Sequence, residues 1–274
     1  MKLNDAHIHL FRGGFPGTYG ALFPKGREVL VYEEIRKTHS IDRALVVGYE
    51  GDPWARGNND YLAGLAKNHP WIAPLAYFPA TKDPAVTKLQ SYWEKGFFGI
   101  SLYVVTESDV EAVSRWSTRV RDELNHHQAI VSLNCPAELV IGLKPLLSTL
   151  DATGILLSHL GMPNDIVGSR ESLKPVLQLS ELPHVGVKLS GAYACNNYPH
   201  PGLSGLVRGL IKAYGTKRLY WGSDFSPALD YISFAQTIGP FAEMSSSLTS
   251  DVLANNLTRI LKRVRCQPSM LVIE

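Results

Sequence analysis

Eight short apolar runs, separated by longer amphipathic stretches, constrain the fold of this chain more than any other feature. Most of the runs are near-continuously apolar, as is typical of parallel strands that are covered on both faces. They cover residues 3–10, 43–48, 72–78, 97–103, 129–135, 154–160, 185–190 and 218–224. A strand followed by a helix, eight times in about 250 residues, is the arrangement of an α/β protein of the (β/α)8 TIM-barrel class.

The stretches between and after these runs predict helices. The expected helices cover residues 59–68, 84–95, 108–127, 136–150, 170–180, 203–214 and 251–263. The pair Ser108 and Asp109 indicates a helix start, and Pro136 suits a first helical turn. These helix-start signals support the alternation of strands and helices.

A doubly wound open sheet is the alternative fold. Such a sheet normally has fewer strands, and the Gly-x-Gly-x-x-Gly turn that would follow its first strand is absent. Residues 12–25, rich in Gly, Pro and Phe, predict instead a long first loop that could cover the mouth of a barrel. Because no linker or repeat divides the chain, we expect one TIM-barrel domain over residues 1–274.

Composition excludes several classes of protein. Lys and Arg number 27 against 25 Asp and Glu, spread along the chain, so we expect no nucleic-acid partner. No apolar run reaches the roughly 18 residues that span a bilayer, and the first residues lack the apolar core of a signal peptide. Three widely spaced cysteines fit a reduced protein. We therefore expect a cytoplasmic protein that does not bind membranes.

The first expected strand carries two histidines, His7 and His9, one residue apart. Residues i and i+2 of a strand point to the same side, with Cα atoms about 6–7 Å apart. Both imidazoles can therefore converge on one small target, and imidazole is the commonest protein ligand for metals. The alternative to a functional site is a pair of surface or hydrogen-bonded histidines.

Two further polar residues end expected strands, His159 on the sixth and Asp224 on the eighth. In a barrel the carboxyl ends of all strands meet at one mouth, where functional residues lie. Three imidazoles and one carboxylate there could bind a divalent metal or orient a carbonyl and a water molecule. Taken singly, His159 could be a capping or core residue and Asp224 a helix N-cap.

Five segments together resemble a known family. They are Asp5-Ala6-His7-Ile8-His9, Ser158-His159-Leu160-Gly161-Met162-Pro163, Val187-Lys188-Leu189-Ser190-Gly191, Trp221-Gly222-Ser223-Asp224-Phe225 and Leu253-Ala254-Asn255-Asn256-Leu257. The combination looks like the amidohydrolase superfamily, and more narrowly its amidohydrolase-related (amidohydrolase 2) branch, which holds lactonases and decarboxylases of aromatic breakdown.

The resemblance implies a barrel with one divalent metal, often zinc, or a metal-free variant of that site. It carries His7, His9 and His159 onto the ligand histidines and Asp224 onto the essential carboxylate. The fifth and seventh strands end without the further histidine that many members have, and no bridging lysine ends the fourth. These departures argue against a binuclear centre and weaken the decarboxylase assignment.

Four other residues near strand ends are candidates. Tyr103, Asn134 and Tyr193 are expected substrate contacts, with simple packing at the rim as the alternative. Lys188, within the seventh strand, would need a carboxylate partner such as Asp224 if it points into the barrel. If it points outward, its stem would lie between helices with the amine in water.

The function predicted from these residues is hydrolysis of a small-molecule lactone or carboxylic ester. Asp224 would be the general base, and His7, His9 and His159 would polarise the carbonyl, through zinc or by hydrogen bonds. The alternatives are a metal-dependent, non-oxidative decarboxylase of an aromatic or related acid, and a binding barrel without chemistry. A homodimer is possible for barrels of this kind.

Overall fold

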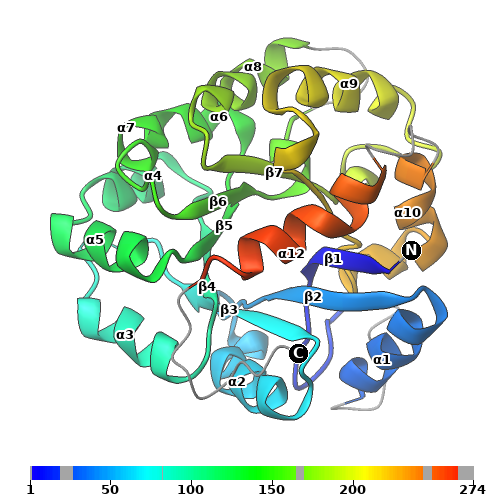
Figure 1. Ribbon diagram of the computed structural model, residues 1–274, viewed down its shortest axis with the longest axis horizontal. Helices are drawn as coiled ribbons and strands as arrows, with labels where there is room; N and C mark the ends of the chain where they lie inside the picture. The colour runs from blue at the N-terminus through cyan, green and yellow to red at the C-terminus, as the bar shows by residue number, and fades with distance from the viewer. Residues whose placement is uncertain (1, 19–26, 82, 165–169, 243–248, 265–274) are drawn as a thin grey trace.

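Eight parallel strands form a nearly closed barrel ringed by helices (Figure 1). The computed structural model describes residues 2–18, 27–81, 83–164, 170–242 and 249–264. The strands are β1 (Leu3–Ile8), β2 (Ile41–Val47), β3 (Ile72–Phe78), β4 (Gly99–Tyr103), β5 (Ile130–Asn134), β6 (Gly154–Leu157), β7 (Val185–Leu189) and β8 (Leu219–Trp221). They lie side by side in chain order. The TIM-barrel class predicted from the alternation is confirmed.

The first and last strands meet just beyond the end of β8. Ile8 pairs with Phe225 in a parallel bridge, and the Asp224 backbone N–H donates to the His7 carbonyl oxygen at 2.8 Å. The His9 backbone N–H donates to the Phe225 carbonyl oxygen at 2.5 Å. His7, His9 and Asp224, three of the residues predicted to carry chemistry, therefore lie at this closure.

Two strands end three residues earlier than the apolar runs predict. β6 ends at Leu157 and β8 at Trp221, three residues before the ends of their runs. The reason is backbone conformation, since His159 has φ 50° and Asp224 φ 59°, both in the left-handed region that strands do not use. Both side chains are therefore presented from turns that follow the strands.

The helices surround the strands. They are α1 (Glu28–Thr38), α2 (Asn58–Asn68), α3 (Val86–Glu94), α4 (Glu107–Ser114), α5 (Thr118–His127), α6 (Ala137–Val140), α7 (Lys144–Leu147), α8 (Arg170–Gln178), α9 (Leu203–Tyr214), α10 (Phe234–Ala242) and α12 (Asn256–Leu261), the last preceded by a π-helical turn at Asp251–Asn255. Short 3-10 turns lie at Pro53–Ala55, Ile141–Leu143, His159–Gly161, Leu179–Glu181, Ala192–Ala194, Thr216–Arg218 and Pro227–Asp230.

Several helix boundaries differ from the expectation. The single helix expected over 108–127 is two, α4 and α5, divided where Trp116 turns into the core and donates from Nε1 to the Thr81 carbonyl oxygen. Its start lies earlier, because Thr106 and Asp109 form a capping box. Pro136 is the N-cap of α6, one position before the first turn. Helices α1 and α10 lie outside the expected ranges.

The core has two layers, one between strands and helices and one inside the barrel. Apolar side chains alternate between them: Ile155 and Leu157 of β6 face the helices, whereas Leu156 joins the interior cluster. Helix α12 covers the start of the strands, and its Ile260 and Leu261 complete that interior cluster. In Figure 1, α12 crosses the middle of the barrel. This end of the barrel is therefore closed by apolar packing.

Nearer the other end, interior positions of the three strands β4, β5 and β7 are polar. Ser101 of β4 lies beside Ser132 of β5 in register, and Lys188 of β7 is flanked by two residues of the outer layer, Val187 and Leu189. All three polar side chains are fully buried. Lys188 thus points into the barrel, the first of the two orientations considered above.

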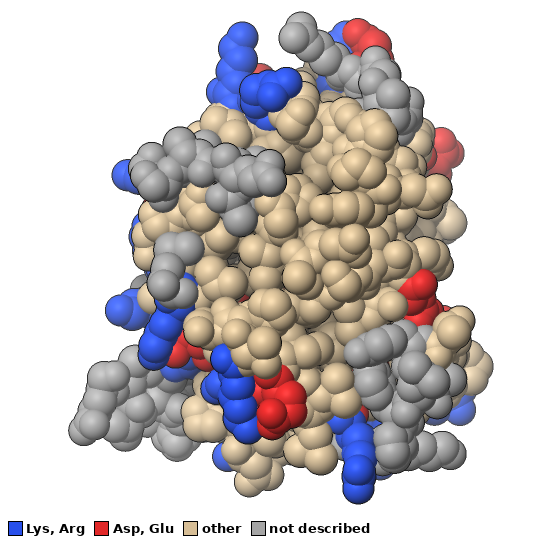
Figure 2. All heavy atoms as spheres, turned by 90° about the vertical axis from the view of Figure 1, so that its right-hand side faces the viewer, with Lys and Arg blue, Asp and Glu red and all other residues tan. Residues whose placement is uncertain are grey.

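The outer surface carries scattered charge. Figure 2 shows the right-hand side of Figure 1, where Lys, Arg, Asp and Glu lie mostly around the margins and other residues fill the middle. In the part of the chain that the structure describes, no helix combines the length and the apolar character needed to cross a membrane.

Candidate active site

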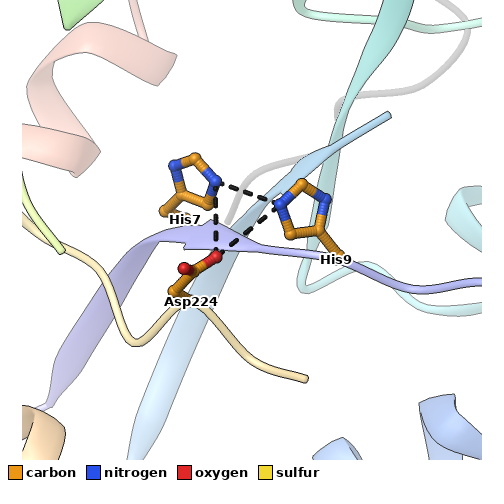
Figure 3. A group of neighbouring side chains, drawn as sticks. All are labelled: His7, His9 and Asp224. Atoms are coloured by element: carbon orange, nitrogen blue, oxygen red, sulfur yellow. Dashed lines mark hydrogen bonds and ion pairs between the residues drawn. The ribbon is translucent and has the colours of Figure 1, made fainter. Parts of the chain in front are cut away.

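His7 and His9 converge at the carboxyl end of β1 (Figure 3). Their Nε2 atoms lie 3.2 Å apart, and both side chains are buried. His9 is held from the other side of its ring, where Nδ1 lies 2.8 Å from the Val47 carbonyl oxygen at the end of β2. A carbonyl only accepts hydrogen bonds, so Nδ1 of His9 carries the hydrogen and Nε2 is left with a free lone pair.

Asp224 faces both imidazoles from the turn after β8. Its Oδ1 lies 3.7 Å from His7 Nε2 and 3.6 Å from His9 Nε2. This oxygen is buried and has no hydrogen-bond partner among the described residues. A buried carboxylate oxygen without a partner is costly, and it marks the place where a cation, a water molecule or a substrate group would bind.

The three atoms fit a divalent cation. They lie 3.2, 3.6 and 3.7 Å from one another. Ligand atoms about 2.0–2.1 Å from a tetrahedral metal are about 3.3–3.4 Å apart. A small inward movement of the side chains would therefore bring all three atoms to bonding distance of one cation. His7, His9 and Asp224 are the group of candidate ligands within the described residues.

His159 lies on the other side of Asp224. Its Nδ1 is 3.7 Å from Asp224 Oδ2 and 3.2 Å from Ser190 Oγ, and its ring centroid is 4.6 Å from that of His7. A Cβ atom on Gly191, which has φ 68°, would lie 2.5 Å from His159 Nδ1, so only glycine allows this approach. Because His159 does not share Oδ1 with the other two histidines, its place among metal ligands stays a prediction.

Tyr193 holds the second oxygen of Asp224. Its hydroxyl donates to Asp224 Oδ2 at 2.5 Å from the 3-10 turn after β7. Burial, together with the Asp224 charge and this hydrogen bond, raises the pKa of Tyr193 well above its usual value. The phenol therefore stays protonated and leaves Oδ1 as the carboxylate oxygen available for chemistry.

Asp5 stabilises the junction of β1 with the turn after β8. Its Oδ1 accepts from the backbone N–H groups of His7 at 3.2 Å and Ser223 at 2.9 Å, and its Oδ2 accepts from the Tyr32 hydroxyl at 3.0 Å. The pairing of β1 with β2 shifts register between Asp5 and Ile8. The shift turns Asp5 toward α1, whereas strict alternation would have placed it beside the two histidines.

Lys188 lies beneath His7 inside the barrel. Its Nζ donates to Ser132 Oγ at 2.6 Å and lies 3.2 Å from His7 Nδ1. Burial lowers the pKa of Lys188 to about 7, against the raising effect of the Asp224 and Asp5 carboxylates. The direct partners of this amine are therefore Ser132 and the ring of His7, and Asp224 acts on it through space.

The three imidazoles are uncharged near neutral pH. Burial lowers the pKa of His9 to about 4, although the Asp224 carboxylate opposes the shift. Burial and the Lys188 charge hold the pKa of His7 well below its usual value, and burial also lowers that of His159. Neutral imidazoles can ligate a metal or donate to a carbonyl.

Two of the predicted substrate contacts, Tyr103 and Asn134, end neighbouring strands. Tyr103 ends β4 and packs against Tyr49 and Tyr77, with ring centroids 4.9 and 6.0 Å away. The Asp224 charge adds to burial in raising the pKa of Tyr103, which places the phenol within electrostatic reach of that carboxylate. Asn134 is the partner of Tyr103 in the pairing of β5 with β4 and is half-buried.

The first loop is tied down by a buried carboxylate that the sequence did not single out. Glu28, at the start of α1, accepts from the backbone N–H groups of Phe11 at 2.6 Å and Phe15 at 3.1 Å and from the Ser226 hydroxyl. Of the loop predicted over residues 12–25, residues 12–18 are described and 19–25 lie outside the described residues. Glu28 joins this loop to the turn that carries Asp224.

A comparison with protein families identifies the family of this chain. The family model described as Amidohydrolase (Amidohydro_2) matches residues 4–255. The chain therefore belongs to the amidohydrolase family, as its motifs predicted. No curated protein gave a significant match.

Solved structures share the fold over nearly the whole chain. An amidohydrolase from Burkholderia multivorans with bound zinc is 17% identical with a TM-score of 0.78, covering 96% of this chain and 99% of that one. A candidate 2-pyrone-4,6-dicarboxylic acid hydrolase from Pseudomonas putida is 20% identical (TM-score 0.75; 96% and 98% covered). A 2,6-dihydroxybenzoate decarboxylase from Rhizobium is 13% identical (TM-score 0.64; 96% and 99%). At these identities the likeness shows the fold.

Proposed function

We propose that this amidohydrolase hydrolyses a small-molecule lactone or carboxylic ester at the centre formed by His7, His9, His159 and Asp224. The observation that carries the proposal is the environment of Asp224 Oδ1. It is a buried carboxylate oxygen with no hydrogen-bond partner among the described residues, and it faces two neutral imidazoles.

Asp224 is the general base in this proposal. A water molecule hydrogen-bonded to Oδ1 would give its proton to the carboxylate as it attacks the substrate carbonyl. Tyr193 keeps Oδ2 occupied at 2.5 Å, so the side chain cannot turn its reactive oxygen away. Cleavage of the ester or lactone bond then returns the proton to the leaving oxygen, and the products are an acid and an alcohol group.

The imidazoles polarise the carbonyl. The cation that we propose for His7, His9 and Asp224 is zinc, because nitrogen ligands with one carboxylate and an open position are typical of its catalytic sites. Such a cation would supply Lewis-acid polarisation of the carbonyl. When no cation is bound, His7 and His159 can stabilise the developing oxyanion by hydrogen bonds, whereas His9 cannot, because its hydrogen lies on Nδ1.

The surroundings favour a substrate with a ring. His159 is the most exposed member of the centre, with 18% of its side chain accessible against 0% for His7 and 5% for Asp224. Aromatic side chains lie nearby: Tyr193 stacks on the exposed Tyr231 with centroids 5.0 Å apart. Flat faces of this kind suit a lactone ring.

Product analysis tests the proposal. The purified protein, with and without added zinc, is offered a panel of sugar lactones, aromatic-derived lactones, simple esters and aromatic acids. Acid release is followed with a pH indicator and carbon dioxide release by mass spectrometry. We expect acid release from at least one lactone or ester and no carbon dioxide.

Two results would overturn the proposal. Carbon dioxide release from an aromatic acid, without acid release from any ester, would assign a decarboxylase. Tight binding of panel members with no turnover in either assay would assign a binding barrel. Asp224→Asn, assayed in parallel, distinguishes turnover at this centre from that of a contaminating esterase, because only turnover here is lost.

A further inference from the structure

A continuous line of polar contacts runs from the end of β2 through both histidines into the barrel. It begins at the Val47 carbonyl oxygen, which accepts from His9 Nδ1 at 2.8 Å. That bond leaves His9 Nε2 without a hydrogen, since a neutral imidazole carries only one. The 3.2 Å contact between the two Nε2 atoms can then be a hydrogen bond only if His7 Nε2 is the donor.

The same reasoning shows which nitrogen of His7 lacks a hydrogen. With its hydrogen on Nε2, neutral His7 has a free lone pair on Nδ1. The atom facing that lone pair is Lys188 Nζ, 3.2 Å away, which also donates to Ser132 Oγ at 2.6 Å. Lys188 has several hydrogens to give, so it can donate to both neighbours at once.

We infer that Lys188 is a positioning residue that holds the hydrogen of His7 on Nε2. In this arrangement the His7 N–H points toward His9 and Asp224, where a substrate carbonyl can accept it. The arrangement also occupies the lone pair that His7 would need to bind a metal through Nε2. Lys188 thereby weakens His7 as a metal ligand and favours direct hydrogen bonding to the carbonyl.

The two histidines differ in what surrounds them. A histidine that binds a metal almost always donates its other ring N–H to a carboxylate, a carbonyl or water. His9 meets this requirement through Val47, whereas the second nitrogen of His7 faces an amine. Metal binding through both Nε2 atoms would require Lys188 to accept from His7 while still donating to Ser132. The inference concerns the centre of the proposed function and rests on that assignment of the site.

The position of the hydrogen is measurable in the wild-type protein. After removal of metal with a chelator, two-dimensional NMR of protein with 15N-labelled histidine distinguishes rings protonated on Nε2 from those protonated on Nδ1. The spectrum of His7→Gln, which lacks the ring, identifies the His7 signal. We expect the hydrogen of His7 on Nε2 and that of His9 on Nδ1.

Zinc affinity gives a second readout. Lys188→Met keeps a side chain of similar length without the donor, and calorimetric titration should show zinc binding about tenfold to a hundredfold tighter than in wild type, the size typical of changes around metal ligands. Lys144→Met is the matched control, because Lys144 lies on α7 and pairs with Glu181. Its zinc affinity should equal that of wild type.

Either readout can overturn the inference. A His7 hydrogen on Nδ1 in the metal-free wild type would contradict it, and this test needs no variant to fold. Unchanged or weaker zinc binding in Lys188→Met would contradict it as well. Neither measurement uses a substrate, so failure of lactone hydrolysis, which would overturn the proposed function, leaves both results interpretable.

Discussion

Asp5 makes the pH dependence of stability predictable. The carboxylate is fully buried, and burial raises its pKa to about 6 from 3.8, despite hydrogen bonds to Ser223, His7 and Tyr32 that oppose the shift. A carboxyl whose pKa is higher in the folded protein than in the unfolded chain favours folding while it is protonated. The stability it provides is complete below about pH 4 and is lost as the pH rises through about 6.

The size of the effect follows from the shift. Two pKa units correspond to about 3 kcal/mol, of which about 2 kcal/mol falls between pH values of about 4.5 and 7.5. Asp5→Asn removes the ionisation but keeps an oxygen for the backbone N–H groups of His7 and Ser223 and a polar group beside Tyr32. Relative to wild type, the variant should therefore be about 2 kcal/mol more stable at the higher pH than at the lower.

Urea denaturation of both proteins across this range measures the difference. A constant offset from altered hydrogen bonding cancels, because only the change with pH is compared. Asp42→Asn, on a surface carboxylate paired with Lys2, controls for the change in net charge. A free-energy difference between Asp5→Asn and wild type that stays flat across the range would refute the reasoning.

Substitutions at two further residues, Tyr193 and Glu28, test other parts of the site. Tyr193→Phe removes the hydrogen bond to Asp224 Oδ2 and should lower kcat about tenfold or more with little change in KM. The reason is that a hydrogen bond to a charged group contributes about 1.5–3 kcal/mol. An unchanged kcat in steady-state assays would show that this bond has no catalytic role. Glu28→Ala leaves the N–H groups of Phe11 and Phe15 without their acceptor and should destabilise the protein by about 2–4 kcal/mol in urea denaturation, whereas Glu28→Gln, which keeps an acceptor oxygen, should lose less. Equal losses in the two Glu28 variants would contradict this account.

The sequence predicted the barrel well because the signal is repeated eight times. Each strand is a short apolar run, and an error at one boundary does not change the class of fold. The boundaries that differ have local causes. The left-handed conformations of His159 and Asp224 end two strands early, and such backbone angles are not readable from an apolar pattern. The division of 108–127 depends on the burial of Trp116, a tertiary contact.

The centre itself was less predictable than the fold. Strand ends indicated which residues gather at the barrel mouth, but not which oxygen or nitrogen each presents. The role of Asp5 depends on a register shift in β1 that reverses the expected alternation. The direction of Lys188 depends on which face of β7 lies inward, and the flanking Val187 and Leu189 suit either face until the helices are placed.

The rate of Asp224→Asn tests the central claim most directly. On the best lactone or ester of the panel, this variant should lose at least about a hundredfold in kcat, the contribution typical of general-base catalysis, while its unfolding transition stays close to that of wild type. The near-isosteric amide cannot take a proton from water but fills the same space. Turnover at a rate close to wild type would contradict the assignment of Asp224 as the base and, with it, the proposed hydrolytic centre.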